Sequence, residues 1–437
     1  MEWYFLAIIF FGALLILLFM GTPVAFAFML VSLTMVFFLW HGEVGMMQII
    51  VNIKTHMAKF VWMPLVLFIM MGTVIFHAGL APQMISAIDN WLGRLPGRLG
   101  LLAVASGTLL ATLTGSSMAS TAVLGSMLTP EMEKRGYKKP MSLGPILGSG
   151  GLAMMIPPSG LAVFAAVIAE ASIGKILMGI IIPGLMMASL YAAYTILRCR
   201  FQPSIAPAYD ITPPPLKIKL LDTARYILPV SIIIFLVIGV ILLGIATPSE
   251  AAATGAVGCF LLAATYGKLT WKAMKSSLIS TTQIATMVLI VAVGAIIYSQ
   301  MLTFTGLGRE VAAWITSLDV QPIIVIIFIQ VLGVMIGMFM IALAVLTIIL
   351  PVFLPIIAGL GFDPIWFVVI MLLNTEMAQT SPPYGSGLII MRGVAPRDTT
   401  MGHIYKAALP YLGCDVIVLA IMIAFPKVVL WLPSLTR

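Results

Sequence analysis

The chain has 437 residues, of which 61% are hydrophobic and 9% are charged, and its formal net charge is +8 at pH 7. A soluble domain carries about 25% charged residues, so this composition excludes a soluble protein of the same length. We attribute the basic excess to the positive-inside rule of membrane proteins and expect no nucleic-acid partner. The three cysteines are scattered and form no metal-binding spacing.

The first half of the chain contains apolar runs close to the about 20 helical residues that cross a bilayer. In chain order we predict helices that end near residues 20 and 40, a helix at 61–77, an amphipathic segment at 82–92, an apolar segment at 99–130, a helix broken at 157–160 and a helix at 176–197. The segment 99–130 is interrupted at Thr114-Gly115-Ser116-Ser117, which leaves arms of about 15 residues. Such arms are short for a full crossing, so we predict a re-entrant hairpin.

The segment 198–225 is rich in proline and has basic residues at both ends, so we interpret it as a linker. Beyond it the pattern of the first half returns at an offset of 225 to 227 residues. The matching landmarks are Thr22-Pro23 with Thr247-Pro248, Gly79-Leu80 with Gly306-Leu307, Pro130 with Pro355, and Pro157-Pro158 with Pro382-Pro383. This nearly constant offset predicts an internal duplication, with repeats at 1–197 and 226–437. The second repeat then has a hairpin at about 322–358 and a helix broken at 380–385.

The distribution of lysine and arginine predicts the orientation of these segments. It places the loop 131–140 and the linker 198–225 in the cytoplasm and the loop 359–364 outside. The two repeats then face opposite ways, as inverted-topology repeats do. We therefore expect an all-α polytopic membrane protein with about ten crossings, two re-entrant hairpins and both termini outside.

The broken segments predict a transport site. Non-helical backbone at membrane depth is tolerated only where protein buries it or where it lines a water-filled cavity. Broken helices that meet in inverted repeats are typical of secondary transporters, because half-helix N-termini suit carboxylates and freed oxygens suit Na⁺. The hydroxyls available at the breaks are those of Ser116, Ser117, Ser159, Thr380 and Ser381. Two alternatives stay open: a structural Pro-Pro kink, and a packing face of small residues at Gly115-Ser116-Ser117.

Few carboxylates fall inside apolar segments. Glu376 lies close to the Thr380 break, and an intramembrane charge is a functional candidate by default. Glu250 follows Thr247-Pro248 at the start of a helix, where an acidic side chain stabilises the N-terminus. We expect Glu170 and Asp415 to be solvated, because both lie near predicted helix ends.

The stretch TGSSMASTAVLGSMLTPEMEKRGYKK, followed by MMIPPSG, closely resembles the large, DctM-like membrane subunit of tripartite ATP-independent periplasmic (TRAP) transporters, in the ion-transporter superfamily. The stretches GIATPSEAAATGAVG and LPVFLPIIAGLGFDPIWF match the same family in the same order. The resemblance implies a non-enzymatic, Na⁺-driven elevator-type importer of an organic acid in the bacterial inner (cytoplasmic) membrane. It also implies a small four-helix membrane subunit, a periplasmic substrate-binding protein, an organic anion as substrate, and contact with membrane lipid.

The resemblance further implies two sodium sites and no cofactor besides Na⁺ as the coupling ion. The first comprises Gly115, Ser116, Ser117, Pro157, Ser159 and Gly160, and the second Gly337, Met338, Ala342, Thr380, Ser381 and Gly385. Our candidates for substrate contact are Thr114, Ser117, Pro158, Glu376 and Pro382. The family commonly has an aspartate where this chain has Ile341, so either Glu376 compensates or the second site uses neutral oxygens. The alternative functions are an ion channel and a sodium/anion symporter that needs no binding protein.

Overall fold

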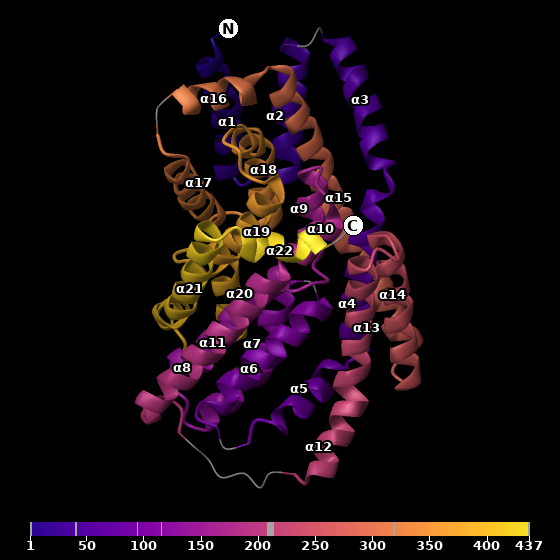
Figure 1. Ribbon diagram of the computed structural model, residues 1–437, viewed down its shortest axis with the longest axis vertical. Coiled ribbons are helices and arrows are strands. Elements are labelled where there is room, and N and C mark those ends of the chain that lie inside the picture. The colour runs from indigo at the N-terminus through magenta and orange to yellow at the C-terminus, as the bar shows by residue number, and fades with distance from the viewer. Residues whose placement is uncertain are drawn as a thin grey trace.

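The computed structural model describes residues 2–39, 42–93, 95–114, 116–207, 214–317 and 320–435 (Figure 1). All regular secondary structure within these ranges is helical, which confirms the predicted all-α class. The helices of the first half are α1 (Trp3–Phe19), α2 (Val24–Leu39), α3 (Glu43–Met57), the 3₁₀ helix η1 (Phe60–Trp62), α4 (Met63–His77), α5 (Ala81–Asp89), α6 (Arg98–Thr114), α7 (Ser117–Lys134), α8 (Lys139–Met155), α9 (Gly160–Ile168), α10 (Ile173–Gly179) and α11 (Ile181–Phe201).

The second half begins after the 3₁₀ helix η2 (Pro203–Ile205). Its helices are α12 (Leu216–Asp222), the π-helical turn η3 (Thr223–Ile227), α13 (Leu228–Leu242), α14 (Pro248–Thr265), α15 (Trp271–Phe304), α16 (Leu307–Ser317), α17 (Pro322–Gly337), α18 (Ala342–Gly359), α19 (Pro364–Thr380), α20 (Ser386–Val394), α21 (Met401–Ala424) and α22 (Lys427–Leu435). Helices α6 to α8 lie in the lower half of Figure 1, and α16 to α18 lie in the upper half.

Several helices are long and apolar enough to cross a bilayer. Among the described residues there are six such spans: Phe60–His77, Ile173–Phe201, Leu216–Leu242, Trp271–Phe304, Ala342–Gly359 and Met401–Ala424. Helices α8 and α9, bent by 46° at their break, make a seventh if they are counted as one span. The chain is therefore a polytopic membrane protein, while the figure of ten crossings stays a prediction.

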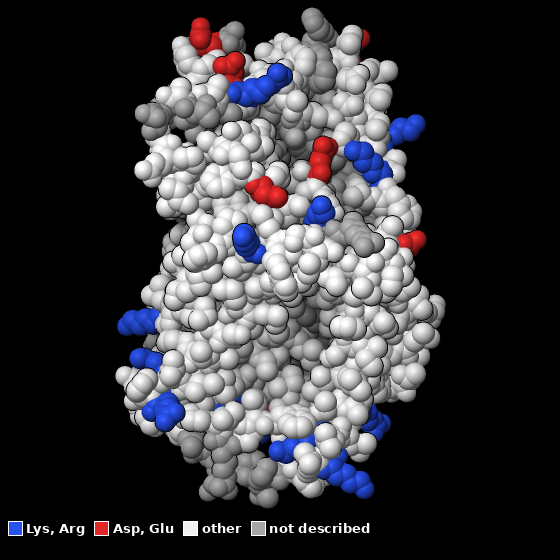
Figure 2. Space-filling view, in the orientation of Figure 1, with Lys and Arg blue, Asp and Glu red and all other residues white. Residues whose placement is uncertain are grey.

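The surface agrees with a lipid environment. On the face shown in Figure 2, charged side chains are sparse and much of the surface is uncharged. Large apolar side chains are exposed on helices that lie at the outside of the bundle, such as Phe38 on α2 and Phe235 on α13, which are both 76% exposed. Exposed apolar area of this extent is expected where lipid or a membrane partner covers the protein.

Helices α8 and α19 form the centre of the bundle. Every residue from Met141 to Met155 is buried, and so is every residue from Trp366 to Thr380. Helix α8 packs closely against α21 because it carries glycine at the contact. A Cβ atom at Gly148 would lie 2.6 Å from the ring of Tyr411 on α21, so glycine lets the ring rest on the α8 backbone.

The helix bounds in the two halves correspond. Helix α18 begins and ends 225 residues after α7, and α19 begins and ends 225 residues after α8. A duplication would produce such a match. The inverted orientation of the two repeats stays a prediction.

The predicted linker is shorter than 198–225. Helix α11 continues to Phe201, and α12 begins at Leu216 and leads without interruption into η3 and α13. Arg198 and Arg200 lie in the last turn of α11, where basic side chains interact favourably with the helix dipole. Basic residues that suggested a solvated linker therefore belong to a helix end.

Candidate functional site

Three of the helix breaks open into one cavity of about 250 Å³. Helix α7 contributes Ser116 and Ser117, α9 contributes Gly160, and the turn into α18 contributes Ile341 and Ala342. Gln379, near the end of α19, lines the same space. The opposite wall comes from α4 and α15 and is apolar: Leu65, Ile69, Ile284, Met287 and Val288.

The N-termini of three helices line the cavity, where basic side chains could otherwise be expected. Helices α7, α9 and α18 begin at Ser117, Gly160 and Ala342, and all three residues line the cavity. The first N–H groups of a helix lack partners within the helix, and the N-terminus carries a partial positive charge. No lysine, arginine or histidine occurs among the lining residues in the described part of the chain. Any attraction for an anion among these residues therefore comes from helix N-termini and from neutral donors such as the Gln379 amide.

Three residues of the predicted first sodium set, Ser116, Ser117 and Gly160, line this cavity. The hydroxyl oxygens of Ser116 and Ser159 each accept a hydrogen bond of 3.3 Å, from the backbone N–H of Ala119 and Ala162 respectively, and so cap α7 and α9. A hydroxyl oxygen has two lone pairs, so the Ser159 oxygen can interact with a further partner besides the Ala162 N–H. Pro157 and Pro158 are buried in the bend between α8 and α9.

Two predicted residues cannot be placed in the same way. Gly115 lies outside the described residues, and Thr114 is the last residue of α6. The side chain of Ser117 is buried at the start of α7, beside the cavity.

The predicted second sodium set surrounds the end of α19. Gly337 ends α17 and packs against Ala378, because a Cβ atom at Gly337 would lie 2.5 Å from the Ala378 methyl group. Met338 begins the turn toward α18, in which only Ile341 and Ala342 reach the cavity.

The second break is built from backbone oxygens. The hydroxyl of Ser381 donates to the carbonyl of Met377 at 2.6 Å, and the hydroxyl of Thr380 is 3.2 Å from the same oxygen. A Cβ atom at Gly385 would lie 2.3 Å from the carbonyl oxygen of Gln379, so glycine is required there. Pro382, a substrate candidate, is half-buried in this turn.

Glu376 faces the first repeat. Its side chain is 1% exposed, and a Cβ atom at Gly151 on α8 would lie 1.5 Å from its Oε1 atom. Neither carboxyl oxygen of Glu376 accepts a hydrogen bond from a donor among the described residues. The nearby groups that act on it electrostatically are the Ser117 hydroxyl and the Asp415 carboxyl. The contacts of this carboxyl are thus with α7, α8 and α21.

The expectation that Asp415 is solvated was wrong. Its side chain is 1% exposed and accepts a hydrogen bond from the hydroxyl of Tyr191 on α11. One turn earlier on α21, the Tyr411 hydroxyl lies 2.9 Å from the Thr195 hydroxyl of α11. Asp415 is buried because α21 continues to Ala424, so the residue lies inside the helix and not near its end.

The other two carboxylates behave as expected. Glu250 and Thr247 form a capping box, in which the Thr247 N–H donates to Glu250 Oε2 at 2.8 Å. The Glu170 side chain is 76% exposed.

Sequence reasoning missed three buried amides. Gln379 lines the cavity, is 2% exposed, and its side-chain oxygen has no hydrogen-bond partner among the described residues. Asn374 donates to the backbone oxygen of Gln330 at 2.7 Å and to its side-chain oxygen at 2.8 Å. The available signal was a cluster of polar residues within the otherwise apolar run Pro364–Thr380, of which only Glu376 was singled out before the break.

The sequence model of the protein family described as "Tripartite ATP-independent periplasmic transporter, DctM component" matches residues 11–428. The C4-dicarboxylate TRAP transporter large permease protein DctM of Rhodobacter capsulatus is 29% identical, over 98% of this chain and 99% of that protein. The isethionate TRAP transporter permease protein DctMQ of Oleidesulfovibrio alaskensis is 30% identical, over 96% of this chain and 65% of that protein. The sialic acid TRAP transporter large permease protein SiaM of Vibrio cholerae is 26% identical, over 96% of both chains.

Solved structures share the fold at low identity. The YdaH transporter of Alcanivorax borkumensis has a TM-score of 0.62 and 17% identity, over 90% of this chain and 91% of that chain. The MtrF structure of Neisseria gonorrhoeae has a TM-score of 0.59 and 13% identity, over 89% of this chain and 85% of that chain. With a family match over nearly the whole length, the chain belongs to the DctM family of TRAP transporters and is a membrane transporter subunit, not an enzyme.

Proposed function

We propose that the chain is the large subunit of a Na⁺-driven, binding-protein-dependent importer, and that its organic anion binds in the cavity where α7, α9 and α18 begin. The observation that carries this proposal is the convergence of three helix N-termini on a space whose described lining has no basic side chain. The relatives named for C4-dicarboxylate, isethionate and sialic acid support an anionic substrate, because each of these compounds carries an acidic group.

Oxygen donors near the breaks support Na⁺ as the co-transported ion. The Ser116 and Ser159 hydroxyl oxygens lie at the starts of α7 and α9, and the backbone carbonyls of Gln379 and Ser381 lie close to Gly385. A hard cation prefers such oxygen ligands. Because the Glu376 carboxyl rests on Gly151 of α8, we assign the second sodium site to neutral oxygens and do not expect Glu376 to replace the aspartate missing at Ile341.

The cavity walls support an elevator-type movement. On one side lie the N-termini of the half-helices, and on the other the described lining residues of α4 and α15 are all apolar. A group containing α6 to α9 and α17 to α20 can slide along that apolar wall without breaking hydrogen bonds there. Sliding of packed helices is an established form of domain movement.

We propose a small membrane subunit and a periplasmic substrate-binding protein as partners, in the bacterial inner membrane. This chain covers 65% of the DctMQ relative, so that protein is long enough to hold a further subunit. Exposed apolar side chains such as Phe38 suit contact with lipid or with the small subunit.

Reconstitution in liposomes tests this function. The complex is assembled with its binding protein, and uptake of labelled succinate, isethionate and sialic acid is measured. We expect uptake that needs both an inward Na⁺ gradient and the binding protein. Flux that ignores the gradient would favour a channel, and Na⁺-driven uptake without the binding protein would favour the simpler symporter.

A further inference from the structure

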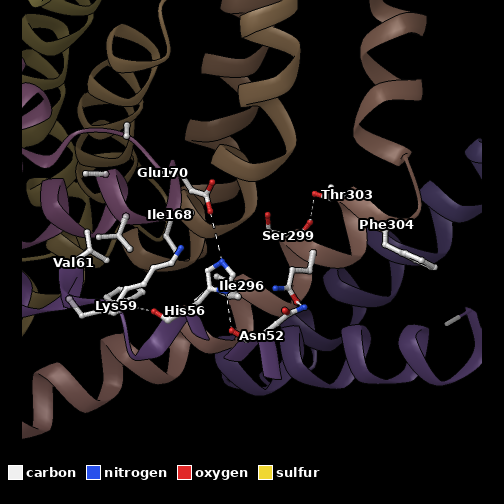
Figure 3. Close-up of a pocket in the computed structure, with 16 residues that line it drawn as sticks. Asn52, His56, Lys59, Val61, Ile168, Glu170, Ile296, Ser299, Thr303 and Phe304 are labelled. Carbon is white, nitrogen blue, oxygen red and sulfur yellow. Dashed lines mark hydrogen bonds and ion pairs between the residues drawn. The ribbon is translucent and has the colours of Figure 1, made fainter. Parts of the chain in front are cut away.

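A second, more polar cavity of about 640 Å³ lies between α3, η1, the end of α9 and the last third of α15 (Figure 3). Its polar lining comes from Asn52 and His56 on α3, Lys59 before η1, Glu170 after α9, and Ser299, Gln300 and Thr303 on α15. The apolar lining includes Val61, Ile168, Ile296 and Phe304.

This outer cavity and the inner one share three walls. Helix α9 lines the inner cavity with Gly160 and the outer cavity with Ala166 to Ile168. The η1–α4 segment and α15 likewise line both. Nine residues of helix cover about 13 Å, so the two spaces lie roughly one short helix apart along the same surfaces. An anion that enters the outer cavity is already beside the elements that form the inner one.

The outer cavity supplies the basic side chains that the inner one lacks. Lys59 is exposed, and its side chain has no ion pair or hydrogen bond among the described residues, while its backbone N–H donates to the carbonyl of His56. His56 holds its ring through Nδ1, which lies 3.0 Å from the backbone oxygen of Asn52. That contact leaves Nε2 directed into the cavity, where it lies 4.0 Å from Glu170 Oε1 (Figure 3).

Asn52 also fixes the Gln300 amide. Asn52 Nδ2 donates to Gln300 Oε1 at 3.2 Å, so the Gln300 NH₂ group points away from that bond and keeps its two donors. The ammonium group of Lys59, the imidazole of His56 and the NH₂ group of Gln300 thus face one space. This combination is suited to a carboxylate or sulfonate.

Glu170 occupies an unusual backbone position. It has φ = +50° at the end of α9, where the left-handed region favours glycine. A glycine would fit this turn without strain, so the local fold does not explain the glutamate. Its carboxylate instead opposes His56 across the rim of the cavity.

We propose that the outer cavity is an entry vestibule that concentrates the organic anion through Lys59 and His56. In the empty vestibule the Glu170 carboxylate interacts with His56, and the entering anion displaces it. The inference rests on the proposed function for the identity of the anion, but the preference of the cavity for anions can be measured without transport.

The test is chemical labelling of a single cysteine in the full chain. Ser299→Cys places a thiol on the vestibule wall, and the three native cysteines, Cys199, Cys259 and Cys414, are buried and give a low background. The thiol is reacted with anionic sulfonatoethyl methanethiosulfonate and, separately, with its cationic trimethylammonium analogue. The ratio of the two rates reports the local potential and not the general access to the site.

We expect Lys59→Gln to lower the anion-to-cation rate ratio by about tenfold at low ionic strength, and Glu170→Gln to raise it. Lys54→Gln is the matched control, because it removes the same charge from an exposed position on α3 that does not line the cavity. If the rate ratio does not change in Lys59→Gln, or if it falls equally in Lys54→Gln, the vestibule proposal is wrong.

The two proposals fail in different ways. A rate ratio that responds as expected, in a complex that transports no organic anion, contradicts the proposed function and leaves the anion preference of the vestibule intact. A ratio that does not respond, in a complex that does transport, contradicts the vestibule alone. In a transporting complex, Lys59→Gln should also raise KM for uptake by severalfold and leave kcat near its original value.

Discussion

The two helix breaks that look alike in the sequence are used differently. Pro157 to Gly160 are all buried, Ser159 caps α9, and the N-terminus of α9 lines the inner cavity. At the second break Pro383 and Tyr384 are exposed, and α20 begins after Gly385 without a side-chain cap. The second half instead contributes the start of α18 and the amide of Gln379. Corresponding positions in a duplicated pattern can therefore diverge, since the first break lines the inner cavity directly and the second lies beside it after Gln379.

The largest effect should come from a charge at Gln379, the polar contribution of the second half. Gln379→Glu places a carboxylate beside the three helix N-termini, where it would occupy the positive potential and repel the substrate. At about 4 Å and an effective dielectric constant of about 20, two like charges repel by about 4 kcal/mol, so uptake should fall by two to three orders of magnitude. Initial uptake rates in liposomes measure this. Gln379→Asn, which keeps the amide, is the control, and near-normal uptake by the glutamate variant would place the substrate elsewhere.

The next largest effect concerns the contact of Glu376 with the first half. Gly151→Ala puts a methyl group into the space of the Glu376 carboxyl and should destabilise the protein by about 1–3 kcal/mol, seen as a lower Tm in detergent. Glu376→Ala in the same chain should restore part of the loss, because it removes the clashing group. Gly413→Ala is the matched control, since nothing lies within 4 Å of a Cβ atom at Gly413. Equal Tm values for the two glycine variants would mean that Glu376 does not rest on α8.

A smaller effect is expected at the serine that caps α7. Ser116→Ala removes a capping oxygen worth about 1 kcal/mol and, if that oxygen also binds Na⁺, raises the Na⁺ concentration needed for half-maximal uptake. Ser116→Thr keeps the hydroxyl and separates the two roles from a change in size. Loss of stability with an unchanged Na⁺ titration would leave Ser116 as a cap only.

The smallest effect concerns a surface contact between the halves. Lys139 at the start of α8 lies 2.8 Å from Asp398 in the loop after α20, and this hydrogen bond lowers the pKa of Asp398 below its ordinary value of 3.8. A carboxyl group whose pKa is lower in the folded state stabilises the fold at pH values above its unfolded-state pKa. This stabilisation is lost as the pH falls through the folded-state pKa. Asp398→Asn should therefore lower Tm slightly at pH 7 and have no effect once the pH is well below 3.8. A Tm difference that persists in acid would point to a cause other than this ion pair.

The positions of the helix breaks could be predicted from the sequence, but the directions in which buried side chains point could not. Serine, glycine and paired proline mark where a helix cannot continue, so the starts of α7 and α9 could be placed within a few residues. The direction of Glu376 could not, because it depends on the absence of a side chain at Gly151, far away in the chain. Periodicity is silent for α19, whose residues are buried all round. Gln379 was not assigned to a buried site for the same reason, whereas Asp415 was expected near a helix end and instead lies inside α21.

Helix α15 has 34 residues and therefore a length of about 50 Å, against about 30 Å for the hydrocarbon core of a bilayer. It must tilt or extend beyond the core, and Trp271, Lys272 and Lys275 at its first turns are suited to the headgroup region. Because the same helix forms a wall of both cavities, its tilt sets the shape of that wall. Bilayer thickness thereby becomes a variable of transport, and lipids of different acyl-chain length should change the rate of uptake without any change in the protein.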